Sequence, residues 1–313
     1  MRNTPFLALA AVLAPLLPVA VAISELATGS TALPEAQMQA AKAVDVPPRP
    51  PSAEEQAKLL DEVRQYALNY TQRLPDFICL EQTRRYVDTT LQESWRLVDL
   101  LTAQLSYFNQ KEDYKLISQN GRAVTDMAYA SVEGAFSMGD FGSTMRDIFD
   151  PASHTSFAWE RWATLRGRRM RIFSYRVPLR LYTIVYQGEQ KDRGQRIKVT
   201  YRGSIFVDGE SSTIIRITQE ALSIPPSFPV RQARATLDYD FVKIGDTEFF
   251  LPLAATLQTH IQMYSGMVWT KNVKEFRSYR KFSADAVIKF DGQEPPPLPE
   301  EKTTAQPPQS EPN

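Results

Sequence analysis

The sequence predicts a mainly β protein built on a strongly curved antiparallel sheet, a half-barrel, with an N-terminal amphipathic helix and a lid-like insertion. Three observations predict it. From Phe77 onward, apolar residues recur at every second position in many short segments. Short polar turns separate these segments, and short connections favour antiparallel pairing because parallel strands need long crossovers. One stretch before Phe77 has helical spacing instead.

Residues 1–22 have the pattern of a Sec signal peptide. Arg2 supplies the positive charge, FLALAAVLAPLLPVAVA follows without a charge, and Ala20-Val21-Ala22 is a cleavage site. We therefore expect the mature chain to begin at Ile23 and to reside in the periplasm or outside the cell. Two prolines and the short apolar core disfavour a membrane anchor, and we expect no transmembrane span in the mature chain.

The ordered domain is expected to begin with a helix. Residues 23–51 are rich in Ala and Pro and predict a flexible linker. Ser52 and Glu55 then have the spacing of a capping box, in which each side chain binds the other residue's backbone N–H. The apolar residues that follow at helical spacing are Leu59, Leu60, Val63, Tyr66, Ala67 and Tyr70. The pattern predicts one helix over about 53–72, which needs an apolar surface to lie on.

Alternation with a period of two predicts the strands. Their expected ranges are 77–88, 93–108, 112–118, 156–165, 168–177, 181–188, 195–207, 212–220, 233–244, 247–259, 271–282 and 285–290. The turn signals between them are Asn120-Gly121, Arg166-Gly167, Asp208-Gly209 and Gly245-Asp246. A single domain is therefore expected over residues 52–290.

Two segments depart from this pattern. Residues 119–155 are rich in Gly and contain the helical run STMRDIF, which predicts a large loop or lid with a helical turn. Residues 291–313 form a Pro-rich tail whose one large aliphatic side chain is Leu298, and this composition predicts disorder. Its PPPLP piece could dock in a groove as a polyproline helix, or it could simply be solvated.

The predicted hairpin TLDYDFVKIGDTEFFLPL, residues 236–253, carries large apolar side chains on both faces. Phe249 and Phe250 must point to opposite faces because side chains alternate along a strand. Something must cover each face. The concave face of the sheet is therefore expected to be filled by a helix, a loop or a bound apolar molecule.

The order of these elements resembles the LolA/RseB superfamily of periplasmic lipid- and lipoprotein-binding proteins. The likeness is architectural and covers most of residues 52–290. The phrases LPDFICLEQTRRY, GDFGSTMRDIF, WERWATLRGRRMRIFSYRV, LDYDFVKIGDTEFFLPL and EFRSYRKFSADAVIKF resemble, more closely, a group of exported bacterial proteins. The resemblance implies a half-open barrel, and it implies no functional residue. The Pro-rich linker and tail depart from the classical carriers, so lipoprotein transport itself is not expected.

The composition gives little support to catalysis or to a cofactor. Lys and Arg together equal Asp and Glu at 36 each, so no nucleic-acid partner is indicated. Two His and one Cys make no metal-ligand cluster, and we expect no cofactor and no metal. Cys79 is expected to be a small buried residue, and His154 to lie in a solvated loop. Asp238 and Asp240 share a strand face, which fits acid–base chemistry, a cation, or an ordinary solvated surface.

Two groups of residues are candidate binding sites. The aromatic residues Phe157, Trp159, Trp162, Phe173 and Tyr175 pair across a hairpin and form either the wall of an apolar pocket or an ordinary sheet core. The hairpin also carries many Arg and no acid over residues 161–180. Its anionic-partner patch comprises Arg166, Arg168, Arg169 and Arg171. These side chains either meet an anionic partner or are balanced by acids on a neighbouring strand.

Three functions follow as hypotheses. The first is an exported, non-enzymatic binding protein that holds an apolar or acyl ligand in the concave face. The second is an envelope module that binds other proteins and has no small-molecule ligand. The third is an enzyme, which the missing motifs disfavour. An open apolar cavity would favour the first, and a concave face filled by the protein's own side chains would favour the second.

Overall fold

A computed structural model describes residues 49–124, 134–135, 142–187, 195–282, 296–299 and 303–305. The chain divides into two units, 1–46 and 47–313, and all described residues belong to the second. The expected signal peptide, most of the expected linker and the expected strand 285–290 lie outside the described residues.

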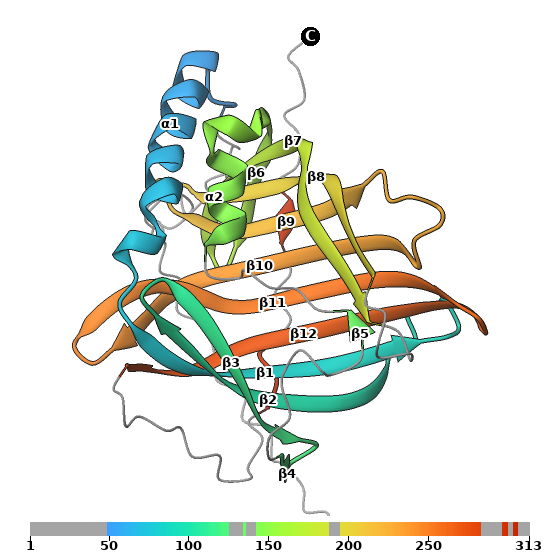
Figure 1. Ribbon diagram of the computed structural model, residues 1–313. Coiled ribbons are helices and arrows are strands. Elements are labelled where there is room, and N and C mark those ends of the chain that lie inside the picture. Colours follow the sequence, from blue (N-terminus) through green and yellow to red (C-terminus); the bar gives the residue numbers. More distant parts are fainter. Residues whose placement is uncertain are drawn as a thin grey trace, which may run out of the picture. The chain divides into compact units, whose positions relative to one another are not determined.

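Two α-helices and a series of strands make up the described unit (Figure 1). The helices are α1 (Ala53–Asn69) and α2 (Ser143–Phe149), with short 3-10 turns at Thr71–Arg73 and Pro151–Ser153. The long strands are β1 (Phe77–Asp88), β2 (Arg96–Phe108), β3 (Lys111–Gln119), β6 (Ser156–Leu165), β7 (Arg168–Gln187), β8 (Gln195–Asp208), β9 (Ile214–Leu222), β10 (Val230–Ile244), β11 (Thr247–Met263) and β12 (Gly266–Lys281). The two-residue strands are β4 (Arg122–Ala123), β5 (Gly134–Ala135) and β13 (Thr304–Ala305).

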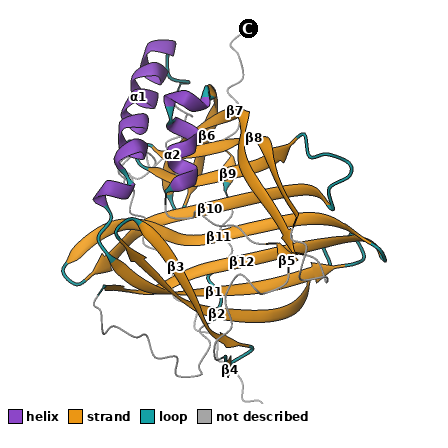
Figure 2. Cartoon of the chain, in the orientation of Figure 1, coloured by secondary structure: helices purple, strands orange, loops and turns teal. Residues whose placement is uncertain are grey.

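The described strands form one antiparallel sheet in the order β13-β6-β7-β8-β9-β10-β11-β12-β1-β2-β3-β4, with β5 paired to β7. Neighbours in sequence are neighbours in the sheet from β6 to β12, as a meander requires. β1 then joins the free side of β12, so the first long strand lies in the middle of the sheet (Figure 2). The predicted fold class, a mainly β protein with one large antiparallel sheet and few helices, is confirmed.

Helix α1 begins where the capping box predicts. The Glu55 N–H donates to Ser52 Oγ at 3.2 Å, and the Ser52 N–H donates to Glu55 Oε2 at 2.6 Å. Val63 and Ala67 are buried in the stripe that faces the sheet, and Tyr70 is buried just after the helix. Helices α1 and α2 lie side by side over one face of the sheet, which we call the helix face (Figure 1).

The main hydrophobic core lies between the two helices and the helix face. From α2 it takes Met145, Ile148 and Phe149. The sheet residues that meet them include Phe77, Cys79, Leu105, Tyr107, Phe173, Tyr175, Leu237, Tyr239 and Phe250, all of which are buried. In the described part of the chain, the protein's own side chains therefore fill this end of the helix face.

The hairpin β10–β11 packs against α1 through its helix face. Leu237 and Tyr239 are buried on the helix face, and the Tyr239 ring stacks on Phe250 at 5.6 Å. The Tyr70 hydroxyl donates to the Phe250 carbonyl at 3.0 Å, which ties α1 to the hairpin. Phe241, two residues beyond Tyr239, is 49% exposed because it lies near the free end of the hairpin.

The structure joins two expected strands into one. Residues 168–177 and 181–188 were expected to be separate strands, whereas β7 runs from Arg168 to Gln187. The register of β7 against β8 shifts between Val177 and Tyr182. Pro178 lies in this interval, and its missing N–H explains why the ladder is interrupted there without the strand ending.

Pieces of the C-terminal tail contact the face opposite the helices. The Leu298 N–H donates to Glu275 Oε1 at 2.9 Å, and the Pro296 carbonyl accepts from Arg277 Nη2 at 2.6 Å. Further along, the Thr303 hydroxyl binds Arg216 Nη1 at 3.1 Å, and β13 pairs with β6 at Ala163 and Thr164. The tail that the sequence predicts to be disordered thus makes specific contacts at its described residues.

Neither helix in the described part of the chain combines the length and the hydropathy that crossing a membrane would take.

Candidate functional site

The aromatic residues singled out in the sequence lie together, and protein side chains cover them. Phe157 stacks on Phe149 of α2 at 5.0 Å. The Trp159 ring meets Phe173 at 5.4 Å and Trp162 at 5.3 Å, both edge to face. Phe173 and Tyr175 are buried, and Phe157, Trp159 and Trp162 are partly buried. Their role in ligand binding stays a prediction. All of them except Trp162 belong to the main core or pack against it.

The anionic-partner patch on the β6–β7 hairpin is paired with acids of the protein. Arg166 binds Asp238 at 3.3 Å and Asp240 at 3.2 Å, and it donates to the Tyr239 carbonyl at 2.7 Å. Arg168 binds Asp208 at 2.6 Å, and Arg171 donates to the Asp208 carbonyl at 2.9 Å. Arg169 is exposed and has a partner too. Acids of the protein thus balance Arg166 and Arg168, and the role of the patch in binding an anionic partner stays a prediction.

Three other residues were considered for catalysis or metal binding, namely Cys79, Asp238 and His154, and each has surroundings typical of a structural residue. Burial raises the pKa of the Cys79 thiol well above its usual range, which disfavours a thiolate. Asp238 accepts from Arg216 Nε at 2.6 Å as well as from Arg166, so its carboxylate serves an ion-pair network. His154 is exposed at the end of a 3-10 turn, as expected. In the described ranges, no group of three His, Cys, Asp or Glu side chains is placed to hold a metal ion.

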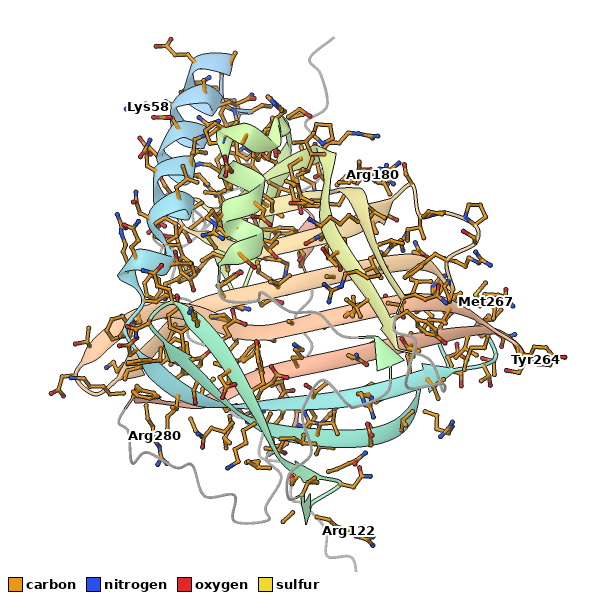
Figure 3. All side chains as sticks on the ribbon, viewed as in Figure 1. Lys58, Arg122, Arg180, Tyr264, Met267 and Arg280 are labelled. Carbon is orange, nitrogen blue, oxygen red and sulfur yellow. The ribbon has the colours of Figure 1, made fainter. Side chains whose placement is uncertain are left out.

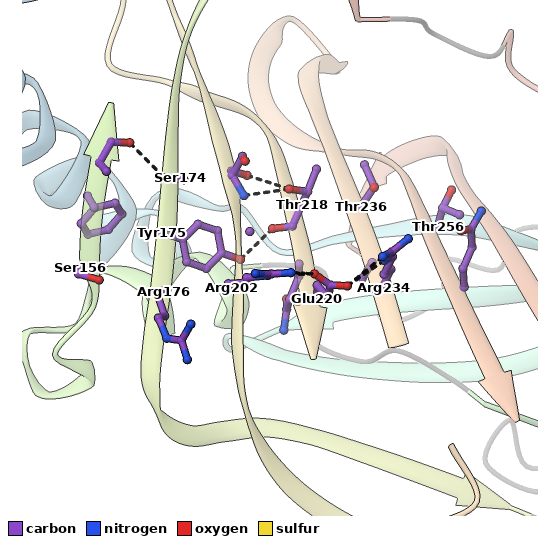
Figure 4. A pocket seen from close by; sticks show the side chains of 17 residues that line it. Ser156, Ser174, Tyr175, Arg176, Arg202, Thr218, Glu220, Arg234, Thr236 and Thr256 are labelled. Atoms are coloured by element: carbon purple, nitrogen blue, oxygen red, sulfur yellow. Dashed lines mark hydrogen bonds and ion pairs between the residues drawn. The ribbon is translucent and has the colours of Figure 1, made fainter. Parts of the chain in front are cut away.

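A groove lies on the other side of the sheet from the core (Figure 4). It has a volume of about 830 Å³ and crosses strands β6 to β11. Pairing of the strands sets its residues in rows across the sheet. The floor row is Ala158, Ser174, Ser204, Thr218, Thr236 and Thr256. The charged row beside it is Arg176, Arg202, Glu220, Arg234 and Gln258.

The floor contains a local break in the ladder between β8 and β9. The Ser204 N–H donates to the Thr218 hydroxyl at 2.9 Å, and that hydroxyl donates to the Ser204 carbonyl at 3.4 Å. The Thr218 hydroxyl thus replaces the backbone hydrogen bonds that would normally form between these two strands. The Thr218 carbonyl accepts instead from the Tyr175 hydroxyl at 2.9 Å (Figure 4).

Glycine at position 203 is required by this arrangement. Gly203 pairs with Tyr175 across β7 and β8. A Cβ atom at Gly203 would lie 1.8 Å from the Thr218 carbonyl oxygen and 3.0 Å from the Tyr175 hydroxyl. Only a residue without a side chain lets the tyrosine hydroxyl reach Thr218, which anchors the groove floor to the core.

The charged row has more positive than negative charge. Glu220 is shared by two arginines, Arg202 at 2.9 Å and Arg234 at 3.0 Å (Figure 4). The hydrogen bond from Arg202 is the largest cause that lowers the pKa of Glu220, so its carboxyl is ionised at neutral pH. Arg176 is exposed, and it has no hydrogen-bond or ion-pair partner within the described residues. The row therefore contains three cations and one anion.

A third row of bulkier side chains lies beside the floor row, on the side away from the charged row. Ile172, Phe206, Arg216 and Asp238 are register partners in a third row across β7 to β10. Arg216 in this row holds Thr303 of the tail. The tail and the charged row therefore lie on opposite sides of the small hydroxyl-bearing floor.

Reasoning from the sequence missed this groove. Its floor residues are common, come from six strands and share no local motif. The available signal was the alternation in FSYRV, residues 173–177, where Ser174 and Arg176 occupy the face opposite to Phe173, Tyr175 and Val177. That alternation gives the face of each residue but not its neighbours across the sheet.

We compared the chain with known proteins, and the matches found are to solved structures. No protein-family model matches the chain, and no curated protein matches it. Among solved structures, the chain is similar to a DUF1329 family protein from Desulfovibrio piger, with 9% identity and a TM-score of 0.33 over 74% of this chain and 94% of that one. It is also similar to the MucA/MucB complex structure of Pseudomonas aeruginosa, with 10% identity and a TM-score of 0.21 over 72% and 100%.

A LolA superfamily protein from Nitrosomonas europaea is similar as well, with 9% identity and a TM-score of 0.23 over 72% of this chain and 94% of that one. At these identities the similarity concerns the fold, and no ligand or partner follows from it.

Proposed function

We propose that the chain is an exported, non-enzymatic binding module and that it binds through the groove on the face opposite α1 and α2. One observation carries this proposal: side chains of α1 and α2 fill one end of the helix face, whereas the groove on the opposite face is open and lined by groups that hydrogen-bond. Its location in the periplasm or outside the cell rests on the signal-peptide pattern of residues 1–22.

The composition of the groove supports binding rather than catalysis. Ser, Thr and Arg dominate the floor and the charged row. The negative charge of Glu220 is balanced by ion pairs with two arginines. A general base would need a free carboxylate or imidazole with a pKa near the working pH. The arrangement instead suits a ligand held by hydrogen bonds and charge.

An apolar or acyl ligand on the helix face is the second candidate function. It was expected from the aromatic residues of β6 and β7. Its support is weaker because Phe157 and Phe173 have partners in the protein's own core. A lipid that co-purifies with the intact protein, seen by native mass spectrometry, would favour this candidate.

The test compares two phenylalanine substitutions on β11. Thr256 lines the groove, whereas Thr247 is exposed at the start of the strand and does not line it. Hydrogen exchange would be measured with and without an envelope extract of the producing cell, separated into a protein fraction and a protein-free fraction. We expect one fraction to protect β7–β10 in the wild type and in Thr247→Phe but not in Thr256→Phe.

The two fractions distinguish a protein partner from a small ligand. Protection that persists in Thr256→Phe, or that appears only on α1 and α2, would overturn the proposal.

A further inference from the structure

We infer that the groove takes an anionic carbohydrate, a sugar chain that carries carboxylate or phosphate groups. The inference rests on the proposed function and specifies its ligand class. It is argued from the charge of one row, the hydroxyl groups of the other, and the direction of the groove across the strands.

The charged row favours an anionic ligand. Arg202 and Arg234 share one carboxylate, and their side chains remain 56% and 59% exposed. Arg176 faces the same groove with its charge unpaired within the described residues. Guanidinium groups bind carboxylates and phosphates through two parallel hydrogen bonds, so exposed arginines in a row favour a ligand with repeated negative charge.

The floor row favours a ligand that carries many hydroxyl groups. Ser and Thr hydroxyls each donate one hydrogen bond and accept two, which matches the mixed donors and acceptors of a sugar. Thr236 and Thr256 have no hydrogen-bond partner for their hydroxyls within the described residues. Their small size also leaves room for a ring above the sheet.

The direction of the groove disfavours a peptide. A peptide that binds a sheet usually adds a strand to a free edge and is held by backbone hydrogen bonds. This groove runs across β6 to β11, whose backbone groups are paired with neighbouring strands or, at the break between β8 and β9, with the hydroxyls of Thr218 and Tyr175. An acidic peptide would be held by its side chains alone, whereas a sugar can use the hydroxyls of the floor and the arginines of the wall together.

The experiment uses the full mature chain and four probes in isothermal titration calorimetry. Hexagalacturonate carries carboxylates, a phosphorylated mannose pentamer carries phosphate, cellohexaose is the neutral control, and hexaglutamate is the anionic peptide control. We expect one of the two acidic sugars to bind, with an affinity that falls as salt rises. The sugar that binds identifies the anion. Tighter binding of cellohexaose or hexaglutamate than of both acidic sugars would overturn the inference.

A matched pair of variants on β7 tests whether the ligand binds in the groove. Arg176 lines the groove, and Arg180 is an exposed arginine of the same strand that does not line it (Figure 3). Arg176→Gln should weaken binding roughly tenfold or more, the loss expected for one hydrogen bond to a charged group. Arg180→Gln should stay within about twofold of the wild type. Equal effects of the two variants would overturn the placement in the groove.

The inference and the proposed function fail in different ways. If hexaglutamate binds, and Thr256→Phe abolishes that binding, the groove is a binding surface and the ligand class is wrong. If no probe and no envelope fraction protects β7–β10 from hydrogen exchange, the proposed function fails as well.

Discussion

Thr218 supplies a side-chain hydroxyl where strands β8 and β9 would otherwise exchange backbone hydrogen bonds. Replacing it by Val removes both bonds to Ser204, whereas Ser keeps the hydroxyl. We expect Thr218→Val to lower the free energy of unfolding by roughly 1–2 kcal/mol, the usual cost of unmade hydrogen bonds, and Thr218→Ser to lower it less. Urea unfolding measures the difference. Equal stability of the two variants would contradict a structural role for the hydroxyl.

His260 gives a pH dependence that can be tested in the same way. Its ring stacks on Trp269 at 4.2 Å, and burial, followed by the nearby Arg234, lowers its pKa below 6.5. Below pH 6.5 the unfolded chain therefore binds this proton more readily than the folded one, so stability falls as the pH drops through this range. We expect His260→Gln to reduce the slope of unfolding free energy between about pH 7 and 5.5. An unchanged slope would contradict the lowered pKa.

At the scale of elements, helix α1 binds the sheet through a stripe that the sequence already showed. Val63 is fully buried, whereas Lys58 lies on the outer side of the same helix (Figure 3). Val63→Asp places an unpaired charge in the core and should lower the free energy of unfolding by roughly 3 kcal/mol or more. Lys58→Asp should change it by less than about 0.5 kcal/mol. Thermal unfolding compares the two, and similar melting temperatures would mean that α1 does not pack.

Elements were predictable from the sequence wherever local chemistry specifies them. The capping box set the start of α1, and Arg166-Gly167 set a hairpin turn because both residues adopt a positive φ, 51° and 71°. The division of β7 at Pro178 was wrong because a proline interrupts a ladder without always ending a strand, and the two-residue strands β4, β5 and β13 were not expected. The place of β1 beside β12 was not predictable, since no local pattern encodes pairing between distant strands.

The candidate site was less predictable than the elements for the same reason. Phe157 pairs with Tyr175 and Trp159 pairs with Phe173, as expected, because hairpin pairing is local. Whether they meet a ligand or α2 depended on where residues 143–149 lie, which alternation does not reveal. The groove depends on the register of six strands at once, and a shift of one residue in any strand would turn its floor side chain to the other face.

At the scale of the whole molecule, the first expectation concerns export. The cleavage pattern Ala20-Val21-Ala22 predicts a mature chain that begins at Ile23. Intact-mass measurement of the protein from its own cell envelope should give the mass of residues 23–313. A species that retains Met1 and stays in the membrane fraction would contradict it.

The C-terminal tail provides the last test, because its described residues tie distant strands together. Leu298 binds Glu275 of β12, Thr303 binds Arg216 of β9, and β13 covers the edge of β6. A chain that stops after residue 295 loses all three contacts, whereas one that stops after Ala305 keeps them. We expect the shorter chain to lose roughly 1–3 kcal/mol of unfolding free energy, as for a few lost hydrogen bonds.

The shorter chain should also exchange faster at the one amide of Ala163 and Thr164 that points to β13, since an uncovered strand edge has unpaired backbone groups. Amides of α1 make no contact with these tail residues and should exchange at the same rate in both chains. Hydrogen exchange with mass spectrometry resolves the two regions. If both chains match in stability and in exchange along β6, the contacts of the tail do not form in solution. If the shorter chain unfolds more easily and exchanges faster along β6, the tail is a structural part of the sheet's opposite face.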